Sequence, residues 1–489
     1  MADTERDLMR PDLWDLLLPA LKAARRAGRE YEGRGKYVPR QSVTKYREND
    51  AGWPQTTENT FGSGANDEPI DWPEMFGLNP GLLTRIPVSD VPELAWAVSE
   101  ISRRALDDEE LLRGVSLLAP LHKPEERRAQ VEFETIRILV GRILNRADAV
   151  GAESDDELLS IYRQIERARF AKELTGNVVV PLVAVSFDAT EPIHVDGNTW
   201  IERLTVDDHR VRAMSWLRQD GVSPYVAAAA THAVVLRNVR FPNRVHTLMT
   251  GRDVPAELSV EITQTVAEAI HIVTEKTTGY AQVLVRPHDW AESWVQDLPP
   301  LWSAWSGRVY PEELNDRRWD KDLTPITAGD ADEIVRIAKA LKAAPKNVQI
   351  AARRCRRTTF RDDTEDLVLD VAIGIEALVG KEPDALTHRM AQRAAIALAD
   401  NIPPENTYSL LKQFYGIRSK IAHGETPKRW TVKLNGQEFQ ARWAGLFLLR
   451  MLLRSRLLAD KPWDAASLDK GMLDKFQRPD GYPSLESTE

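Results

Sequence analysis

Two blocks of sequence decide the fold of the C-terminal part: DLVLDVAIGIEALVG at 366–380 and LLKQFYGIRSKIAHGE at 410–425. The first block is apolar on nearly every side, which is typical of a helix at the centre of a bundle. In the second block, apolar residues recur at helical spacing, at Leu411, Phe414, Ile417 and Ile421. Gly424 and Pro427 then predict the end of this helix, because glycine accepts the left-handed conformation and proline blocks continuation.

Helical patterns extend on both sides of these blocks. They predict helices at 329–343, 346–358, 363–379, 385–400, 405–422 and 436–459. The connections between them are short, so consecutive helices are expected to pack as antiparallel neighbours. The sequence therefore predicts an all-α bundle over 329–460, followed by a C-terminal tail at 461–489.

The part before residue 329 has a mixed pattern. For residues 1–80 the pattern predicts an amphipathic helix at 8–31, followed by a long loop or arm. For residues 81–328 it predicts a mixed α/β region, to which we assign a sensory or regulatory role. Its helical patterns lie at 91–106, 124–147 and 154–173. A β-rich part follows at about 175–290, with strands expected at 178–187, 192–204, 232–241 and 281–287, the second broken by a hairpin signal at Asp196-Gly197. The predicted fold class is α+β.

The charge of the chain is unevenly distributed. The 489 residues carry a net charge of −9, which argues against a protein that coats nucleic acid over its whole surface. Residues 331–460, however, hold 22 Lys+Arg against 15 Asp+Glu, and the acidic surplus lies before and after them. The predicted bundle is thus the part whose charge suits a phosphate-bearing partner.

Cysteine content, targeting signals and short motifs narrow the expected cellular location and the expected cofactors. The single cysteine, Cys355, can form neither an intramolecular disulfide nor a cysteine-rich zinc site, so a reducing, cytoplasmic location is expected. The first 21 residues lack the basic start of a signal peptide, and the most apolar windows are too short or carry arginines, which predicts no membrane segment. Neither a metal-ligand motif nor a phosphate loop is recognisable, so no metal or cofactor is expected. Five tryptophans at 290–319 favour packing over a pocket for a ring-shaped ligand.

One constellation carries candidate chemistry, at the end of the helix over 405–422. Arg418 is followed after four residues by His423, with Ser419 and Lys420 between them. The carboxyl end of a helix stabilises positive charge, which favours a protonated His423. Arg418 offers a planar fork to a phosphate and His423 a titratable donor.

This stretch, RSKIAHG, resembles the R-x4-6-H motif of HEPN domains. Together with HRMAQRAAIALA at 388–399, the ordered blocks look like the Apea-like HEPN branch known from bacterial anti-phage systems. The resemblance covers about 345–460, roughly a quarter of the chain. It implies a metal-independent endoribonuclease without a cofactor, acting as a homodimer in which two motifs face each other across one composite site.

In such a site the resemblance makes Arg418 and His423 the catalytic residues. His423 would transfer protons and Arg418 would stabilise the charge of the phosphorane, leaving 2′,3′-cyclic phosphate ends and sparing DNA, which lacks the 2′-OH. The expected partner is RNA, either tRNA or another cellular RNA. The implied role is that of a toxic effector of abortive infection, with the N-terminal region sensing a phage-derived trigger or restraining the nuclease.

Residues around the motif have supporting roles in this reading. Glu376 is expected to orient Arg418, although an ion pair with Arg389 or Arg393 is an equal alternative. Residues five apart on a helix differ by about 140°, so either the helix unwinds at His423-Gly424 or a second copy completes the site. A path for RNA is predicted along Arg353, Arg354, Lys428, Arg429 and Arg450. The competing hypothesis is a catalytically inactive module that binds nucleotide, RNA or a partner protein.

Overall fold

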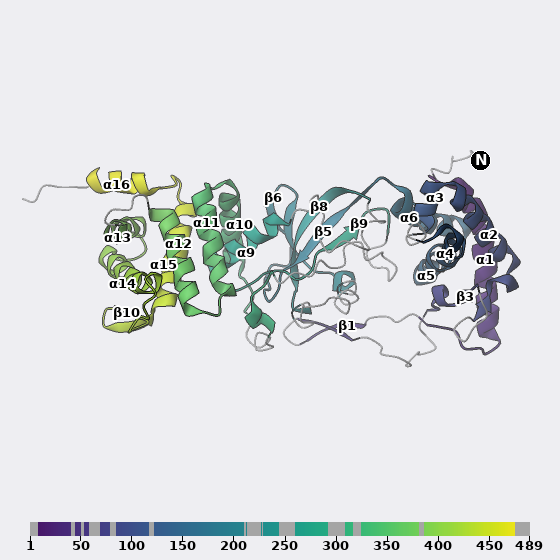
Figure 1. The fold of residues 1–489 in the computed structure, drawn as a ribbon, viewed down its shortest axis with the longest axis horizontal. Coiled ribbons are helices and arrows are strands. Elements are labelled where there is room, and N and C mark those ends of the chain that lie inside the picture. Colours follow the sequence, from purple (N-terminus) through teal and green to yellow (C-terminus); the bar gives the residue numbers. More distant parts are fainter. Residues whose placement is uncertain are drawn as a thin grey trace, which may run out of the picture. The chain divides into compact units, whose positions relative to one another are not determined.

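The computed structural model describes residues 8–40, 45–49, 53–57, 69–78, 85–116, 122–209, 212, 226, 228–243, 260–291, 309–315, 324–380 and 386–474. Packing divides the chain into two compact units, which are described separately (Figure 1). The first consists of Met1–Pro181, Glu202–Ser259 and Tyr280–Arg308. The second consists of Leu182–Ile201, Val260–Gly279 and Val309–Glu489. The C-terminal helices therefore pack with two segments that precede the boundary predicted at residue 328.

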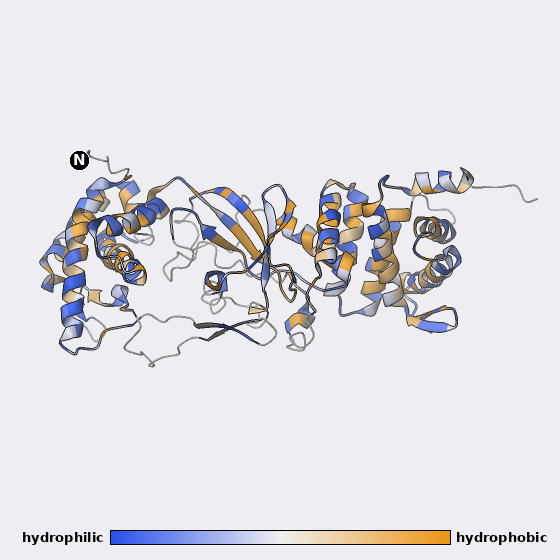
Figure 2. Cartoon of the chain, turned by 180° about the vertical axis from the view of Figure 1, so that it is seen from behind, coloured by the Kyte–Doolittle hydropathy of each residue, from blue (hydrophilic) through white to orange (hydrophobic). Residues whose placement is uncertain are grey.

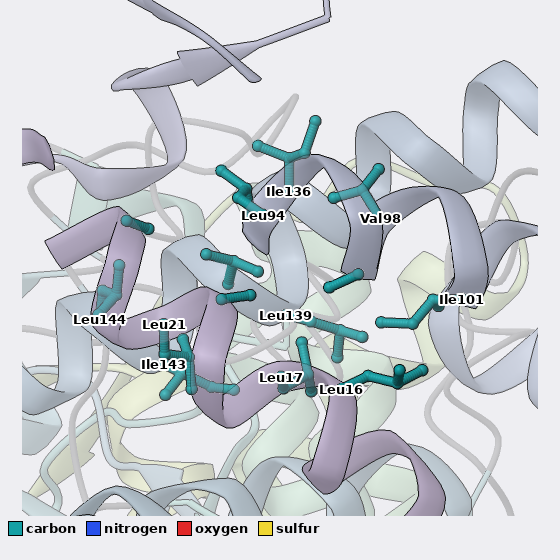
Figure 3. Packing of buried hydrophobic residues seen from close by; sticks show 14 of the residues in the cluster. Leu16, Leu17, Leu21, Leu94, Val98, Ile101, Ile136, Leu139, Ile143 and Leu144 are labelled. Atoms are coloured by element: carbon teal, nitrogen blue, oxygen red, sulfur yellow. The ribbon is translucent and has the colours of Figure 1, made fainter. Parts of the chain in front are cut away.

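The first unit begins with a helical cluster. Its helices are α1 (Pro11–Gly33), α2 (Pro92–Asp107), α3 (Glu109–Val115), α4 (Pro124–Glu134), α5 (Gly141–Val150) and α6 (Asp155–Phe170), with a π-helical segment, η4 (Thr135–Val140), joining α4 to α5. These agree with the helices predicted at 8–31, 91–106, 124–147 and 154–173. Figure 3 shows the shared core, to which α1, α2, η4 and α5 contribute Leu16, Leu17, Leu21, Leu94, Val98, Ile101, Ile136, Leu139, Ile143 and Leu144.

The segment predicted as a long loop or arm contributes to this core, which corrects that prediction for its described residues. It contains a hairpin of β1 (Lys45–Glu48) and β2 (Pro54–Thr57), the turn η1 (Trp72–Glu74), and β3 (Phe76–Gly77), which pairs with β4 (Ile86–Pro87). The Trp72 side chain is fully buried, and its indole N–H donates to Asp148 at 2.6 Å. The ring lies so close to α1 that only glycine fits at Gly28. Packing of single aromatic residues leaves no periodic signal, so the sequence pattern missed it.

A five-stranded sheet follows the helical cluster in sequence. Its strand order is β6-β7-β8-β5-β9, with β5 (Glu173–Pro181), β6 (Ile193–Asp196), β7 (Thr199–Arg203), β8 (His232–Pro242) and β9 (Leu284–Pro287). The hairpin predicted at Asp196-Gly197 is confirmed, and Gly197 adopts a φ of +51° in its turn. Trp290 packs edge-on against Phe241 and donates to the Thr175 carbonyl at 2.6 Å, as expected for a packing role. The other four tryptophans of 290–319 lie outside the described residues.

The second unit is built mainly from helices. They are α9 (Glu261–Thr274), α10 (Ala328–Ala343), α11 (Lys346–Arg357), α12 (Thr364–Val379), α13 (Leu386–Ala397), α14 (Pro404–Ala422), α15 (Ala441–Leu458) and α16 (Ala465–Asp474). Contacts of α15 reach α9, α10, α11, α12, α13 and α14, so it is central to the bundle. Gly374 allows α12 to approach Leu449, and Gly445 allows α15 to approach Phe414 of α14. In Figure 2, hydrophobic and hydrophilic residues alternate along these helices, as expected for helices with one buried side and one exposed side.

Two predictions for this unit need correction. Helix α9 lies in the region predicted to be β-rich, and it packs against α10, α11 and α15 of the bundle. The bundle is also not all-α, because β10 (Thr431–Leu434) and β11 (Gln437–Gln440) form a hairpin where a helix was expected from residue 436. Its turn is Asn435-Gly436, with φ values of +51° and +81°. Asn-Gly is a strong signal for this kind of turn, so the sequence did contain the information.

The predicted α+β fold class is confirmed, since the chain forms groups of helices together with several mainly antiparallel sheets. The predicted C-terminal tail also begins with structure. Helix α16 packs against α13, and its Asp469 accepts two hydrogen bonds from Arg393, both at 2.7 Å.

Candidate functional site

The carboxyl end of α14 sets the position of His423. The helix ends at Ala422, and the Gly424 and Glu425 N–H groups donate back to the carbonyls of Ile421 (3.0 Å) and Lys420 (2.9 Å). This pair of bonds defines a Schellman motif, and the φ of +74° at Gly424 is the left-handed conformation that the motif requires. His423 is the last residue before that turn and lies outside the regular helix. The helix end predicted from Gly424 and Pro427 is confirmed.

Arg418 lies five residues before His423, and its side chain contacts a neighbouring helix. Its guanidinium forms an ion pair with Glu376 of α12, with 3.1 Å between Nη2 and Oε1. Both side chains keep part of their surface exposed, 32% for Arg418 and 26% for Glu376. Of the alternative partners, Arg393 is buried and binds Asp469 and the Val379 carbonyl instead. Glu376 therefore lies where it can orient Arg418.

Tyr415 is a third member of this group that the sequence pattern did not single out. Its hydroxyl donates to the Ala372 carbonyl of α12 at 3.1 Å. Burial, and then the negative charge of Glu376, raise the pKa of Tyr415 well above its usual value. The tyrosine thus stays neutral and links α14 to α12 beside the Glu376–Arg418 pair. Only the three-dimensional contact reveals this role, because an aromatic residue on a core-facing stripe looks like ordinary packing.

The surface around the end of α14 is polar and positively charged. His423, Ser419 and Lys420 are exposed, and so are Lys428 and Arg429 in the segment that leads to β10. Within the described part of the chain, the His423 ring makes no hydrogen bond or ion pair. An exposed imidazole of this kind, near flexible cations, is accessible to a phosphate group.

The hairpin β10–β11 is fastened to α14 close to this surface. The Gln413 amide of α14 donates to the Lys433 carbonyl at 2.9 Å, and its carbonyl oxygen accepts from the Lys433 N–H at 2.8 Å. Val432 is fully buried, whereas every residue of β11 is exposed. The chain that leaves His423 is therefore returned to the bundle by a short, well-anchored element.

The predicted RNA path is not continuous. Arg450 is 6% exposed and donates to the carbonyls of His271, Ile272 and Val273 at the end of α9, so its place on that path was wrong. Arg354 forms an ion pair with Asp370 of α12. Arg353 is exposed and remains accessible.

A buried polar group lies where α9, α11 and α15 meet. Burial raises the pKa of Glu268 to about 7, although Arg356 and Arg353 act in the opposite direction. Burial also raises the pKa of the Cys355 thiol to about 12 and lowers that of His271 to about 4. A thiol with such a high pKa is a poor nucleophile, so Cys355 is a packing residue.

The described residues contain no group of three or more His, Cys, Asp or Glu side chains placed to hold a metal ion. Among the same residues, none of the helices combines the length and apolarity needed to cross a membrane. Comparisons of the chain with protein-family models, with curated proteins and with solved structures find no match.

Proposed function

We propose that the chain is a metal-independent endoribonuclease of the HEPN type whose catalytic residues are Arg418 and His423. The observation that carries the proposal is that an arginine held by Glu376 and an exposed histidine lie five residues apart at one helix end. Glu376 and Tyr415 hold the Arg418 side of α14 against α12, and the Schellman motif presents His423 to solvent. Lys420, Lys428 and Arg429 supply further positive charge nearby in sequence.

In the proposed reaction, the ribose 2′-oxygen attacks the adjacent phosphorus and the bond from phosphorus to the 5′-oxygen breaks. One imidazole takes the 2′-OH proton, and a protonated imidazole gives a proton to the leaving 5′-oxygen. Arg418 stabilises the negative charge of the phosphorane. Two proton-transfer groups are needed, so a homodimer with two copies of His423 in one composite site satisfies the chemistry. The products are a 2′,3′-cyclic phosphate and a 5′-OH.

The proposed setting is the bacterial cytoplasm, where cleavage of tRNA or another cellular RNA stops growth during phage infection. The basic charge balance of residues 331–460 supports an RNA partner for the helices α10 to α15, which lie in that stretch. The N-terminal part would then sense a phage-derived trigger or restrain the nuclease.

The experiment compares purified wild-type protein with Arg418→Ala and His423→Ala on total RNA in the presence of EDTA. We expect both variants to lose at least about 100-fold in rate, since each removes a group that acts in the transition state. Matched controls are Arg103→Ala and His122→Ala in the first unit, whose side chains are 61% and 38% exposed and whose loss should leave activity unchanged. Full cleavage by His423→Ala would refute the proposal.

The competing hypothesis is a module that binds nucleotide, RNA or a partner protein without catalysis. It predicts stoichiometric binding of RNA with no new cyclic-phosphate ends. The same incubation separates the two hypotheses, because the end groups of the RNA are mapped whether or not a complex forms.

A further inference from the structure

A positively charged pocket lies on α1 in the helical cluster of the first unit. Its volume is about 610 Å³, within the range of small-molecule sites. The lining residues are Leu21, Lys22, Arg25, Arg26, Arg29, Glu30, Glu153 and Leu158. The four cations occur at positions i, i+3, i+4 and i+7 of one helix, so they share a single face. Four cations against two carboxylates make the lining positive.

The pocket has a rigid base. Arg25 is 12% exposed and donates to the Ala152 carbonyl at 2.6 Å and to Asp148 at 3.1 Å. Asp148 also accepts the indole N–H of Trp72, and Leu21 belongs to the core shown in Figure 3. The Nε of Arg25 is buried and has no hydrogen-bond partner among the described residues. Arg25 is therefore part of the base of the pocket, and the exposed cations are Lys22, Arg26 and Arg29.

Lys22, Arg26 and Arg29 form at most exposed ion pairs and are accessible to a ligand. Arg26 lies 3.7 Å from Glu93, and both side chains are largely exposed. Arg29 makes no ion pair within the described part of the chain and is exposed. Lys22 pairs with Asp155 at 2.6 Å, but about half of each side chain faces solvent. Exposed ion pairs of this kind contribute little to the stability of the fold. A phosphate can therefore replace the carboxylate partner at a small cost in free energy.

We propose that this pocket binds a free nucleotide. The phosphates would contact Arg26, Arg29 and Lys22, whose charges a polyphosphate chain matches. Leu21 and Leu158 are almost fully buried beneath the pocket, so contacts to a base or ribose would come from its polar rim. Glu30 and Glu153 would repel a bare anion, but they accept hydrogen bonds from the hydroxyl and amino groups that a nucleotide carries. The combined lining therefore favours a nucleotide over inorganic phosphate.

The test is a titration of the full-length protein with ATP, tripolyphosphate or adenosine, followed by calorimetry in EDTA. We expect saturable binding of one ATP per chain, with weaker binding of tripolyphosphate and of adenosine. Arg26→Glu and Arg29→Glu should each weaken ATP binding by about tenfold or more, because a charge-assisted hydrogen bond is replaced by repulsion. Arg103→Glu on α2, which is 61% exposed and outside the pocket, should bind ATP as the wild type does.

Each contrary result overturns the proposal in a recognisable way. If ATP does not bind saturably, the proposed site does not exist. The same follows if Arg29→Glu and Arg103→Glu weaken ATP binding equally. If tripolyphosphate binds as tightly as ATP, the pocket recognises anions and not nucleotides. Thermal unfolding of each variant confirms that the helical cluster remains folded. No RNA is present in this experiment, so its outcome is independent of the proposed ribonuclease activity.

Discussion

Arg450 connects the carboxyl end of α9 to the centre of the helical bundle. It donates to three consecutive carbonyls of α9 and forms an ion pair with Glu275. Truncation would leave these carbonyls without donors inside the protein. We expect Arg450→Met to lower the free energy of unfolding by about 2–4 kcal/mol in urea denaturation. The exposed Arg353→Met should change it by less than about 0.5 kcal/mol, and equal effects would contradict the structural role of Arg450.

Glu268 gives the second unit a specific pH dependence. Because its pKa in the folded state, about 7, exceeds that of an unfolded glutamate, the folded protein binds the proton more tightly. This contribution to stability is present below pH 4 and is lost as the pH rises through 7. We expect Glu268→Gln to be more stable than wild type by about 2–3 kcal/mol at pH 8, with a much smaller difference at pH 5. A constant difference in urea denaturation at both pH values would contradict this assignment.

Residues such as these explain what the sequence pattern can and cannot reveal. Arg418, His423 and Gly424 are recognisable because a motif and a helix stop coincide within a few residues. Arg450 and Tyr415 are not, because their roles depend on carbonyl groups of α9 and α12 that are distant in sequence. An arginine on a long basic helix looks like a surface residue until its neighbours are known.

At the scale of elements, the end of α14 is stabilised by one residue in a left-handed conformation. Gly424 has a φ of +74°, which a side chain makes unfavourable. We expect Gly424→Ala to cost about 1 kcal/mol in urea denaturation and to reduce RNA cleavage, because the backbone that positions His423 must shift. Gly416→Ala is the matched control: it lies inside α14 with open space around it and should stabilise the protein by about 0.5–1 kcal/mol.

Loss of activity in Gly416→Ala as large as that in Gly424→Ala would show that the helix end has no special role.

The helices were predicted well where a long helical pattern is closed by glycine or proline, as in α1, α12 and α14. The hairpin β10–β11 was missed because the helical pattern of α15 was extended backwards over its Asn-Gly turn. Helix α9 was missed because it lies between strand signals and is apolar on most sides, which periodicity cannot distinguish from a buried strand.

At the level of the whole molecule, the surplus of positive charge is confined to one stretch of the chain. Residues 331–460 have a surplus of cations, while the chain as a whole is acidic. Packing draws Leu182–Ile201 and Val260–Gly279 into the second unit, although they precede the predicted boundary. No local pattern encodes such long-range assembly, so the partition of the chain had to come from the structure.

The proposed composite site requires two chains. We expect light scattering to give a mass of twice the 55.2 kDa chain at concentrations where RNA is cleaved. The specific activity should fall when the protein is diluted below the dissociation constant of the dimer, because each separated chain has only one His423. A monomeric mass together with undiminished activity would contradict the composite site.

The most direct test of the proposed ribonuclease is a single-turnover assay in EDTA on one RNA whose cleavage position has been mapped. We expect a 2′,3′-cyclic phosphate product from wild-type protein and from His122→Ala, and cleavage at least about 100-fold slower by His423→Ala. We expect no product when a single 2′-deoxy nucleotide replaces the residue at the cut. Cleavage by His423→Ala at the wild-type rate, or cleavage of the deoxy substrate at the same position, would contradict the proposal.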